Sequence, residues 1–207
     1  MASPLLRIHR LGRRFGPREV VRSLDLELEP SQRVALVGAN GSGKTTVLRC
    51  VAGTLLPDRG EISIAGHTAG SMAARRLVGA SLAQERSFYL RLTGHANLMF
   101  FARLRCATER EAASQVSELE EELELSEILS KRTDACSAGM LQQLAFARAL
   151  LGTPGLLLLD EPTRSLDADA VQRLWAAISR RSQTAVLVAT HRDEDLDYCD
   201  DRLELPA

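Results

Sequence analysis

The chain has 207 residues, of which 45% are hydrophobic and 26% charged, a composition typical of one globular domain with a sizeable core. Its formal net charge of −1 at pH 7 argues against a basic nucleic-acid-binding surface, so no nucleic-acid partner is expected. The four cysteines are scattered without metal-ligand spacing, which favours reduced thiols in a cytosolic protein over disulfides.

No stretch of the sequence is long and apolar enough to predict a membrane span. The longest apolar runs, 156–159 and 185–189, are strand-sized, whereas a spanning helix needs about 20 residues. The apolar stretch near the first residue is too short to predict a signal peptide. If the protein acts at a membrane, other chains are expected to hold it there.

The first third is predicted to be rich in β-structure and to lead into a glycine-rich loop. Alternating apolar residues predict strands over 5–10 and 24–28, and a short apolar run predicts a strand over 33–37. The glycine-rich stretch 38–43 follows directly. A helix is expected from about Lys44 to Ala52, because the next residue is a glycine that can end it.

The glycine-rich loop matches the pattern G-x-x-x-x-G-K-S/T and lies between a predicted strand and a predicted helix. The backbone N–H groups of such a loop cradle phosphates, helped by the helix N-terminus behind them. Lys44 is expected to reach the β- and γ-phosphates, and the Thr45 hydroxyl to ligate Mg²⁺. The predicted cofactors are therefore ATP and Mg²⁺. The predicted binding residues of this loop are Gly38, Ala39, Asn40, Gly41, Ser42, Gly43, Lys44, Thr45 and Thr46.

The middle third lacks strand signals over about 95–150 and is predicted to be helical. Thr108 and Glu111 form a capping-box pattern, with Thr108 as the N-cap of a helix. A second helix is predicted over about 138–151. Four glutamates of the first helix are expected to form a solvated face: Glu118, Glu120, Glu121 and Glu122.

The last third returns to strands that alternate with helices. Apolar runs predict buried strands over 156–160 and 184–190, and Asp167 can cap the helix between them. This alternation indicates a largely parallel sheet. The predicted fold class is therefore α/β: a P-loop NTPase core with a largely parallel central sheet, an N-terminal antiparallel β part and an inserted α-helical subdomain.

Two acidic residues, Asp160 and Glu161, end and follow the predicted strand 156–160. Ligands of an open parallel sheet bind at the carboxyl ends of its strands. Asp160 suits a Mg²⁺ ligand held through water, and Glu161 suits a general base that polarises the attacking water. Two acids after an apolar run are ordinarily a solvated turn, but the phosphate loop in the same chain favours the functional interpretation.

A third motif, Cys136-Ser137-Ala138-Gly139-Met140, precedes the second predicted helix. Here the chain resembles the ABC ATPase family, whose signature L-S-G-G-Q lies just upstream of the strand that carries the acidic pair. The resemblance covers essentially the whole chain, and the motifs occur in the family's order. It implies that Ser137, Ala138, Gly139 and Met140 contact the γ-phosphate of a nucleotide bound by a second subunit, through a hydroxyl, backbone N–H groups and a helix N-terminus. Cys136, Ala138 and Met140 depart from the family pattern. Ser-x-Gly-Met variants occur in exporting branches of the family, which favours export.

The resemblance assigns roles to four further residues. It implies that Phe15 stacks on adenine and that Gln84 senses both Mg²⁺, as a ligand, and the membrane partner. It implies that Asp167, in the loop 165–167, faces the opposite subunit and its nucleotide, and that His191 contacts the γ-phosphate as a catalytic residue beside Glu161. Taken singly, each has an ordinary alternative: a core aromatic, a surface glutamine, a helix cap and a surface histidine.

The resemblance further implies a mechanism and partners. The domain, 1–207, is expected to be a single ABC ATPase domain with its α/β core at 1–94 and 152–207 and its helical subdomain at about 95–151. Two such chains, expected to be identical copies, would form a head-to-tail dimer with two ATP molecules at the interface. Its closure would drive membrane-spanning transporter subunits, supplied as separate chains and docked near 84–101. The expected location is peripheral, on the cytoplasmic face of the cell membrane.

The sequence disfavours three other classes of function. A soluble ABC ATPase of translation or DNA repair is disfavoured, because the chain has one cassette and no sustained heptads between the loop and the signature. A non-catalytic ATP-binding regulatory module is disfavoured by the presence of Glu161 and His191. A metabolite kinase would share the phosphate loop but would not explain the signature.

Overall fold

The computed structural model describes residues 4–82 and 88–206, which group into two compact units. The core unit contains the described residues within 4–82, 155–161 and 183–206. The helical unit contains residues 88–154 and 162–182. In the part of the chain that the structure describes, no helix has the length and apolar character needed to cross a bilayer.

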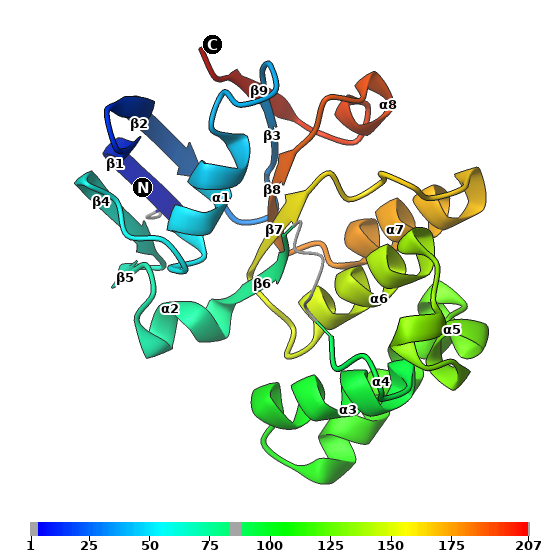
Figure 1. Cartoon of the computed structure of the whole chain (residues 1–207). Helices are drawn as coiled ribbons and strands as arrows, with labels where there is room; N and C mark the ends of the chain where they lie inside the picture. The colour runs from blue at the N-terminus through cyan, green and yellow to red at the C-terminus, as the bar shows by residue number, and fades with distance from the viewer. Residues whose placement is uncertain (1–3, 83–87, 207) are drawn as a thin grey trace. The chain divides into compact units, whose positions relative to one another are not determined.

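The core unit is built on two β-sheets (Figure 1). The first is antiparallel, with the strand order β2-β1-β4-β5, and the second is parallel, with the order β6-β7-β8-β3-β9. The strands are β1 (Leu6–Phe15), β2 (Arg18–Leu28), β3 (Arg33–Val37), β4 (Arg59–Ile64), β5 (His67–Thr68), β6 (Val78–Ser81), β7 (Leu156–Asp160), β8 (Ala185–Ala189) and β9 (Asp201–Glu204). The helices of this unit are α1 (Lys44–Val51), α2 (Met72–Leu77) and α8 (Asp193–Leu196).

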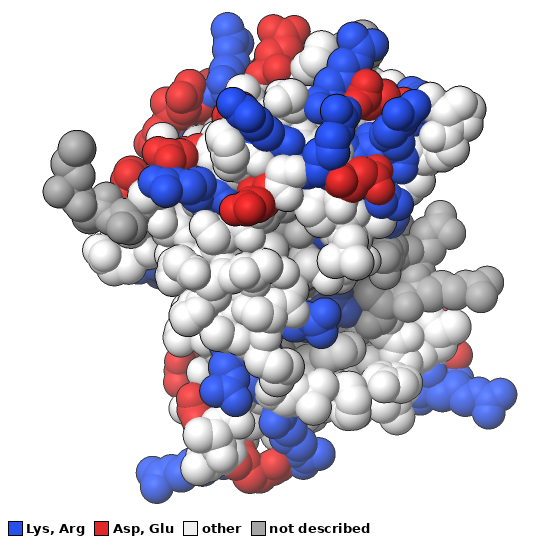
Figure 2. Space-filling model, turned by 90° about the vertical axis from the view of Figure 1, so that its left-hand side faces the viewer, with Lys and Arg blue, Asp and Glu red and all other residues white. Residues whose placement is uncertain are grey.

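The antiparallel sheet follows the alternation of its sequence. Leu6 of β1 lies opposite Leu28 of β2 and is fully buried, whereas the neighbouring Arg7 forms an exposed ion pair with Glu27 at 2.8 Å. One face of the sheet therefore joins the core and the other meets water. On the face of the molecule shown in Figure 2, basic and acidic side chains lie beside one another in the upper part rather than in separate areas of one charge.

The parallel sheet brings three strand ends to one edge. All five residues of β7 and all five of β8 are buried, as continuous apolar runs predict for the centre of a parallel sheet. Leu36 of β3 pairs with Ala189 of β8, and Ala189 also pairs with Asp160 of β7. The residues that follow these three strands therefore emerge together at the carboxyl edge of the sheet, where the predicted loop and acids lie.

The helical unit consists of α3 (Gly94–Arg105), α4 (Glu109–Leu123), α5 (Ser126–Ser130), the short 3₁₀ helix η1 (Thr133–Ala135), α6 (Ala138–Leu150) and α7 (Ala168–Arg180). The predicted N-cap is present: the Thr108 hydroxyl accepts a hydrogen bond from the N–H of Glu111 at the start of α4, and the Glu111 carboxylate accepts from the N–H of Ala107, one residue before the N-cap. Helix α7 contacts α4 and α6, so it groups with this unit although the sequence analysis placed it in the core.

The predicted α/β fold class is confirmed.

Several elements were not predicted from the sequence. Strands β4, β5, β6 and β9 and helices α2 and α8 are short, and their periodicity is too weak to be read. Helix α3 is longer, and its N-cap is Thr93, whose hydroxyl accepts a hydrogen bond from the N–H of Ala96. The segment was expected to be helical only as part of the helical subdomain.

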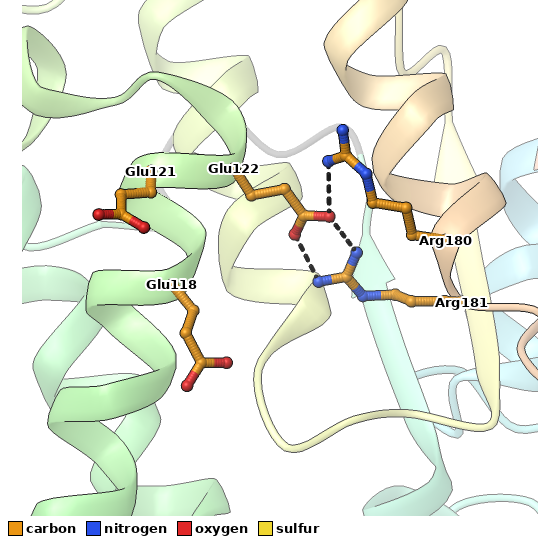
Figure 3. A pocket seen from close by; sticks show the side chains of 5 residues that line it. All are labelled: Glu118, Glu121, Glu122, Arg180 and Arg181. Atoms are coloured by element: carbon orange, nitrogen blue, oxygen red, sulfur yellow. Dashed lines mark hydrogen bonds and ion pairs between the residues drawn. The ribbon is translucent and has the colours of Figure 1, made fainter.

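The expectation of a fully solvated glutamate face on α4 was wrong for Glu122. Its side chain is only 15% exposed. It forms a bidentate pair with Arg181, the C-cap of α7, at 2.7 and 3.0 Å, and a further bond to Arg180 of α7 at 3.2 Å. The three residues border an open depression together with Glu118 and Glu121, and Figure 3 shows Glu122 directed at the two arginines and Glu121 directed elsewhere. Burial raises the pKa of Glu122, but the two guanidinium groups outweigh it and hold this pKa below its ordinary value.

Candidate ATP-binding site

The phosphate loop connects β3 to α1 in the core unit. Gly43 is the N-cap of α1 and has a φ of 101°, a conformation that side chains with a Cβ rarely adopt, and no side chain caps this helix. The loop N–H groups at the helix start are therefore available to an anion. The Lys44 ammonium donates to the carbonyls of Gly38, at 2.7 Å, and Ala39, at 3.2 Å. These bonds tie the end of the phosphate loop to its beginning.

Ser42 offers a test of whether the loop fits a phosphate group. Its side chain is buried, with 5% of the residue exposed, and its hydroxyl has no hydrogen-bond partner among the described residues. A buried hydroxyl without a partner is costly, and a ligand oxygen would satisfy it. Together with the Lys44 charge, this unsatisfied donor fits an anionic phosphate chain.

The first predicted metal ligands lie side by side. The Thr45 hydroxyl, at the start of α1, donates to Oδ2 of Asp160, at the end of β7, over 2.8 Å. Asp160 is almost fully buried. Among the described residues, no group of three or more carboxylate, histidine or cysteine side chains is arranged so that it could hold a metal ion. Mg²⁺ at phosphate sites keeps waters and substrate oxygens and takes only one or two protein ligands, so this oxygen pair fits Mg²⁺.

Glu161 is held at the edge of the parallel sheet in an unusual backbone conformation. Its φ is 49°, in the left-handed region that non-glycine residues seldom occupy, and its N–H donates to the carbonyl of Ala189 at 2.8 Å. Nδ1 of the exposed His191 lies 2.7 Å from the mostly buried Oε2 of Glu161, an ion-pair distance without a well-directed hydrogen bond. The structure therefore brings the two predicted catalytic side chains together, on neighbouring strand ends.

A buried pair that the sequence analysis missed supports His191. The Thr190 hydroxyl donates to Oδ2 of Asp195 at 2.6 Å and accepts from the N–H of Arg192 at 3.1 Å. Thr190 and Asp195 are both buried, so the turn that carries His191 is fixed from both sides. The sequence signal for this pair was Asp195, an acid in the short helix that follows Thr190 and His191. Helical periodicity does not reveal that Asp195 bonds to Thr190, because Thr190 lies before the helix.

Phe15 lies at the end of β1, where its ring is exposed, as stacking on a base requires. The Arg13 guanidinium lies 4.9 Å from the ring centroid. Phe15 pairs with Arg18 of β2, and Arg18 donates to the carbonyl of Gly41 at 3.4 Å. Phe15 is therefore at the end of the antiparallel sheet that adjoins the phosphate loop.

The remaining predicted residues belong to the helical unit or lie outside the described residues. Gln84 lies outside the described residues. Ser137 is the N-cap of α6, where its hydroxyl oxygen accepts from the N–H of Met140 at 3.2 Å and its hydrogen can still donate. Ser137 and Ala138 are exposed. Asp167 caps α7 by accepting from the N–H of Ala170 at 2.8 Å, the ordinary role weighed for it from the sequence.

Gly139 shows why the signature needs a glycine at its fourth position. A Cβ built there would lie 2.4 Å from the carbonyl oxygen of Ser165, far inside any real contact distance. The signature turn and the loop 163–167 are thus packed backbone to backbone within the helical unit. Ser165 itself has a φ of 68°, so this loop is bent into a strained conformation at the contact.

Comparison with known proteins agrees with this geometry. The model of the ABC transporter family matches residues 21–164, more than half of the chain. The chain is 34% identical over 206 residues to the uncharacterized ABC transporter ATP-binding protein YdbJ of Bacillus subtilis, covering 97% of this chain and 66% of YdbJ. It is 32% identical over 208 residues to the daunorubicin resistance ATP-binding protein DrrA3 of Streptomyces coeruleorubidus, covering 99% of this chain and 66% of DrrA3.

The chain therefore spans about two thirds of the length of these relatives. Another relative at 32% identity is named as a sulfate/thiosulfate import protein. A solved structure described as the ATP-binding subunit of an ABC transporter superposes with a TM-score of 0.88 at 28% identity, covering 97% of this chain and 85% of the other. The chain belongs to the ABC transporter family, whose ATP-binding domains hydrolyse ATP, as the sequence motifs indicated.

Proposed function

We propose that this chain binds Mg²⁺–ATP at the edge of its parallel sheet, hydrolyses it within a dimer, and so powers transport through separate membrane-spanning chains. One observation carries the proposal. The Thr45 hydroxyl meets Asp160 at 2.8 Å, and the next residue, Glu161, lies 2.7 Å from His191 on the neighbouring strand end. A phosphate cradle, two oxygen ligands and an acid with a partnering imidazole thus converge within the core unit.

The side chains suit phosphoryl transfer to water. Lys44 would bind the β- and γ-phosphates once it leaves the loop carbonyls that it now contacts. Thr45 and Asp160 would hold Mg²⁺, which when bound neutralises charge on the phosphates. Glu161 would accept a hydrogen bond from the attacking water and orient it for in-line attack, and His191 would hold the Glu161 carboxylate and donate toward the γ-phosphate oxygens.

The second half of each site would come from another copy of the chain. Ser137 and Ala138 are exposed at the N-terminus of α6, a helix of 13 residues whose first N–H groups point outward. This end of the helix, with the Ser137 hydroxyl, suits a γ-phosphate held by the opposite subunit. The exposed loop at Ser165, packed on Gly139, would face the opposite subunit with it.

An apolar patch on the helical unit suits the membrane partner. We define it by five exposed side chains of the loop before α3 and of α3 itself: Tyr89, Leu90, Leu92, Phe100 and Leu104. The rings of Tyr89 and Phe100 lie edge to face, with centroids 5.0 Å apart. A contiguous exposed apolar surface of this kind marks an interaction site, here for an apolar segment of a transporter subunit at the cytoplasmic face of the membrane.

The most specific part of the proposal is the direction of transport. The signature Ser-Ala-Gly-Met resembles exporting branches, and DrrA3 is named for drug resistance, so both support export. The non-catalytic alternative is opposed by the pairing of Glu161 with His191, because a scaffold has no need of an acid in a strained conformation beside the phosphate loop.

The decisive experiment compares Glu161→Gln with the unaltered protein. We expect Mg²⁺-dependent ATP hydrolysis in the unaltered protein, a loss of about 10²–10³-fold in the variant, and an ATP-dependent dimer of the variant in size-exclusion chromatography with light scattering. Glu61→Gln, at an exposed position of β4 in the same unit, is the matched control and should hydrolyse ATP normally. Equal turnover in Glu161→Gln and the unaltered protein would contradict the proposed role of Glu161, and an ATP-bound variant that stays monomeric would contradict the dimer.

A further inference from the structure

The loop formed by residues 88–93, which carries part of the apolar patch, is bonded to the segment just before the signature. Three backbone hydrogen bonds join the two segments. The N–H of Thr133 donates to the carbonyl of Leu92 at 3.0 Å, and the N–H of Asp134 donates to the carbonyl of Leu90 at 3.1 Å. In the opposite direction, the N–H of Gly94 donates to the carbonyl of Lys131 at 2.9 Å. Thr93 and Arg132 form an antiparallel β-bridge between them. The patch loop and the segment 131–134 are therefore bonded to each other along their backbones.

Two buried side chains strengthen this junction. The Thr133 residue is 1% exposed, and its hydroxyl donates to the carbonyl of Tyr89 at 3.0 Å. Asn97 of α3 is fully buried. Its Oδ1 accepts from the N–H of Tyr89 at 2.8 Å, and its Nδ2 donates to the carbonyls of Tyr89 and Thr93, both at 3.1 Å. Buried polar groups that are fully bonded specify one local geometry, because any other leaves them unsatisfied.

The junction leads directly to the signature. Thr133 begins η1, and three residues after it comes Cys136, whose N–H donates to the carbonyl of Thr133 at 3.4 Å. The next residue is Ser137, the N-cap of α6. Only four residues of chain thus separate the bonded junction at Thr133 from the helix end that would meet the γ-phosphate.

The beginning of the same loop is tied to the other end of α6. The guanidinium of Arg148, in the last turn of α6, lies 4.8 Å from the ring centroid of Phe88 and 5.0 Å from that of Phe101. Burial lowers the pKa of Arg148, which agrees with a cation that has left water to pack against both rings. The loop is therefore held at its beginning by the last turn of α6 and at its end by the segment 131–134, which precedes α6.

We propose that Thr133 and Asn97 are positioning residues that couple the apolar patch to the signature, so that ATP-driven ordering at Ser137 also orders the loop 88–93. This rests on the proposed function, since it takes Ser137 as a γ-phosphate contact and the patch as the partner's docking surface. Both residues act through backbone that they hold, and neither is expected to contact ATP.

Hydrogen–deuterium exchange in the Glu161→Gln protein, with and without Mg²⁺–ATP, tests the coupling without the membrane partner. We expect ATP to slow exchange at 137–141 and at 88–94 together, with one common ATP midpoint. Adding Thr133→Val removes the hydroxyl at nearly constant volume, and Thr133→Ser retains it as the matched control. In Thr133→Val the ATP response at 88–94 should fall by about fivefold, the factor that one lost hydrogen bond represents, while 137–141 remains protected. Thr133→Ser should respond at both segments.

The outcomes separate the inference from the proposed function. No protection at 137–141 in the Glu161→Gln protein overturns both. Protection at 137–141 without any response at 88–94 overturns the coupling alone, and this arm needs no substitution at Thr133, so poor folding of Thr133→Val does not affect it. An unchanged loop response in a folded Thr133→Val protein also overturns the role of Thr133. A purely structural role would lower the melting temperature of Thr133→Val but leave the ratio of the two ATP responses unchanged.

Discussion

The core unit and the helical unit place their polar groups by different means. In the core unit, the side chains that we assign to chemistry stand at the ends of apolar strands or at the start of α1. The residues of β7 before Asp160 and all residues of β8 are apolar. In the helical unit, polar and cationic side chains lie among the packed helices: Asn97 and Thr133 are buried, and the Arg148 guanidinium packs against two aromatic rings.

This difference indicates which polar residues serve catalysis and which serve the stability of the fold. Ligands bind at the strand ends of an open sheet, so the polar side chains there, including the buried Asp160, serve the ligand more than the packed sheet beneath them. A buried polar group inside a helical cluster is bonded to the backbone that it positions, so its loss costs folding free energy as well as coupling. Substitutions in the core site should therefore affect catalysis first, and those in the helical interior should affect stability first.

The largest expected effect is a loss of ATP hydrolysis in a variant that still folds. Lys44→Met removes the charge that would bind the β- and γ-phosphates, so kcat/KM for ATP should fall by about 10²–10³-fold while the melting temperature stays nearly constant. Steady-state hydrolysis and thermal unfolding measure the two quantities. The chain's other lysine, Lys131, pairs with Glu127 on the helical unit, and Lys131→Met should leave hydrolysis unchanged. A large drop in melting temperature for Lys44→Met would contradict the comparison.

The next effect is on stability and arises in the helical interior. Asn97→Leu leaves the N–H and carbonyl of Tyr89 without their Asn97 partners, so the free energy of unfolding should fall by about 2–3 kcal/mol. Urea denaturation measures it. His95→Leu, on an exposed position of the same helix, should change stability by no more than about 0.5 kcal/mol. Equal stability of the two variants would mean that Asn97 is not a structural determinant.

A smaller and pH-dependent effect is expected at Glu122. Because Arg181 and Arg180 hold the folded-state pKa of Glu122 below its ordinary value, its carboxylate stabilises the fold above the unfolded-state pKa, and this stabilisation is lost as pH falls through the folded-state pKa. Glu122→Gln should therefore cost about 1–2 kcal/mol at pH 7 and progressively less in acid. Denaturation at several pH values checks this. Glu121→Gln, at an exposed position, should show little cost at any pH, and a Glu122 effect that is constant with pH would contradict the ion-pair explanation.

The smallest expected effect concerns the exposed aromatic of the core site. Phe15→Ala removes the ring proposed to stack on adenine and should raise KM for ATP by about three- to tenfold with little change in kcat. Phe15→Tyr keeps the π-face and should match the unaltered protein. Comparison of ATP with GTP hydrolysis sharpens the test, because a nonspecific structural effect of Phe15→Ala would affect both nucleotides through kcat.

The sequence by itself determined the features that depend on neighbouring residues. The loop from Gly38 to Thr45 is recognisable because its hydrogen-bond donors and its helix start are contiguous, and β3, β7 and β8 were predicted within a residue because buried strands read as unbroken apolar runs. The same holds for Thr108 and Asp167, since an N-cap bonds to an N–H only three residues ahead.

The tertiary structure alone decided the pairings between distant residues. Thr45 meets Asp160 across 115 positions, Glu122 meets Arg181 across 59, and Thr133 meets Tyr89 across 44. The sequence predicted a solvated Glu122 and gave no sign that Asn97 is buried. The burial and the hydrogen bonds of both side chains depend on the elements that pack against them. Local periodicity records which face of an element is apolar, and a polar side chain's partner is fixed only when the elements pack together.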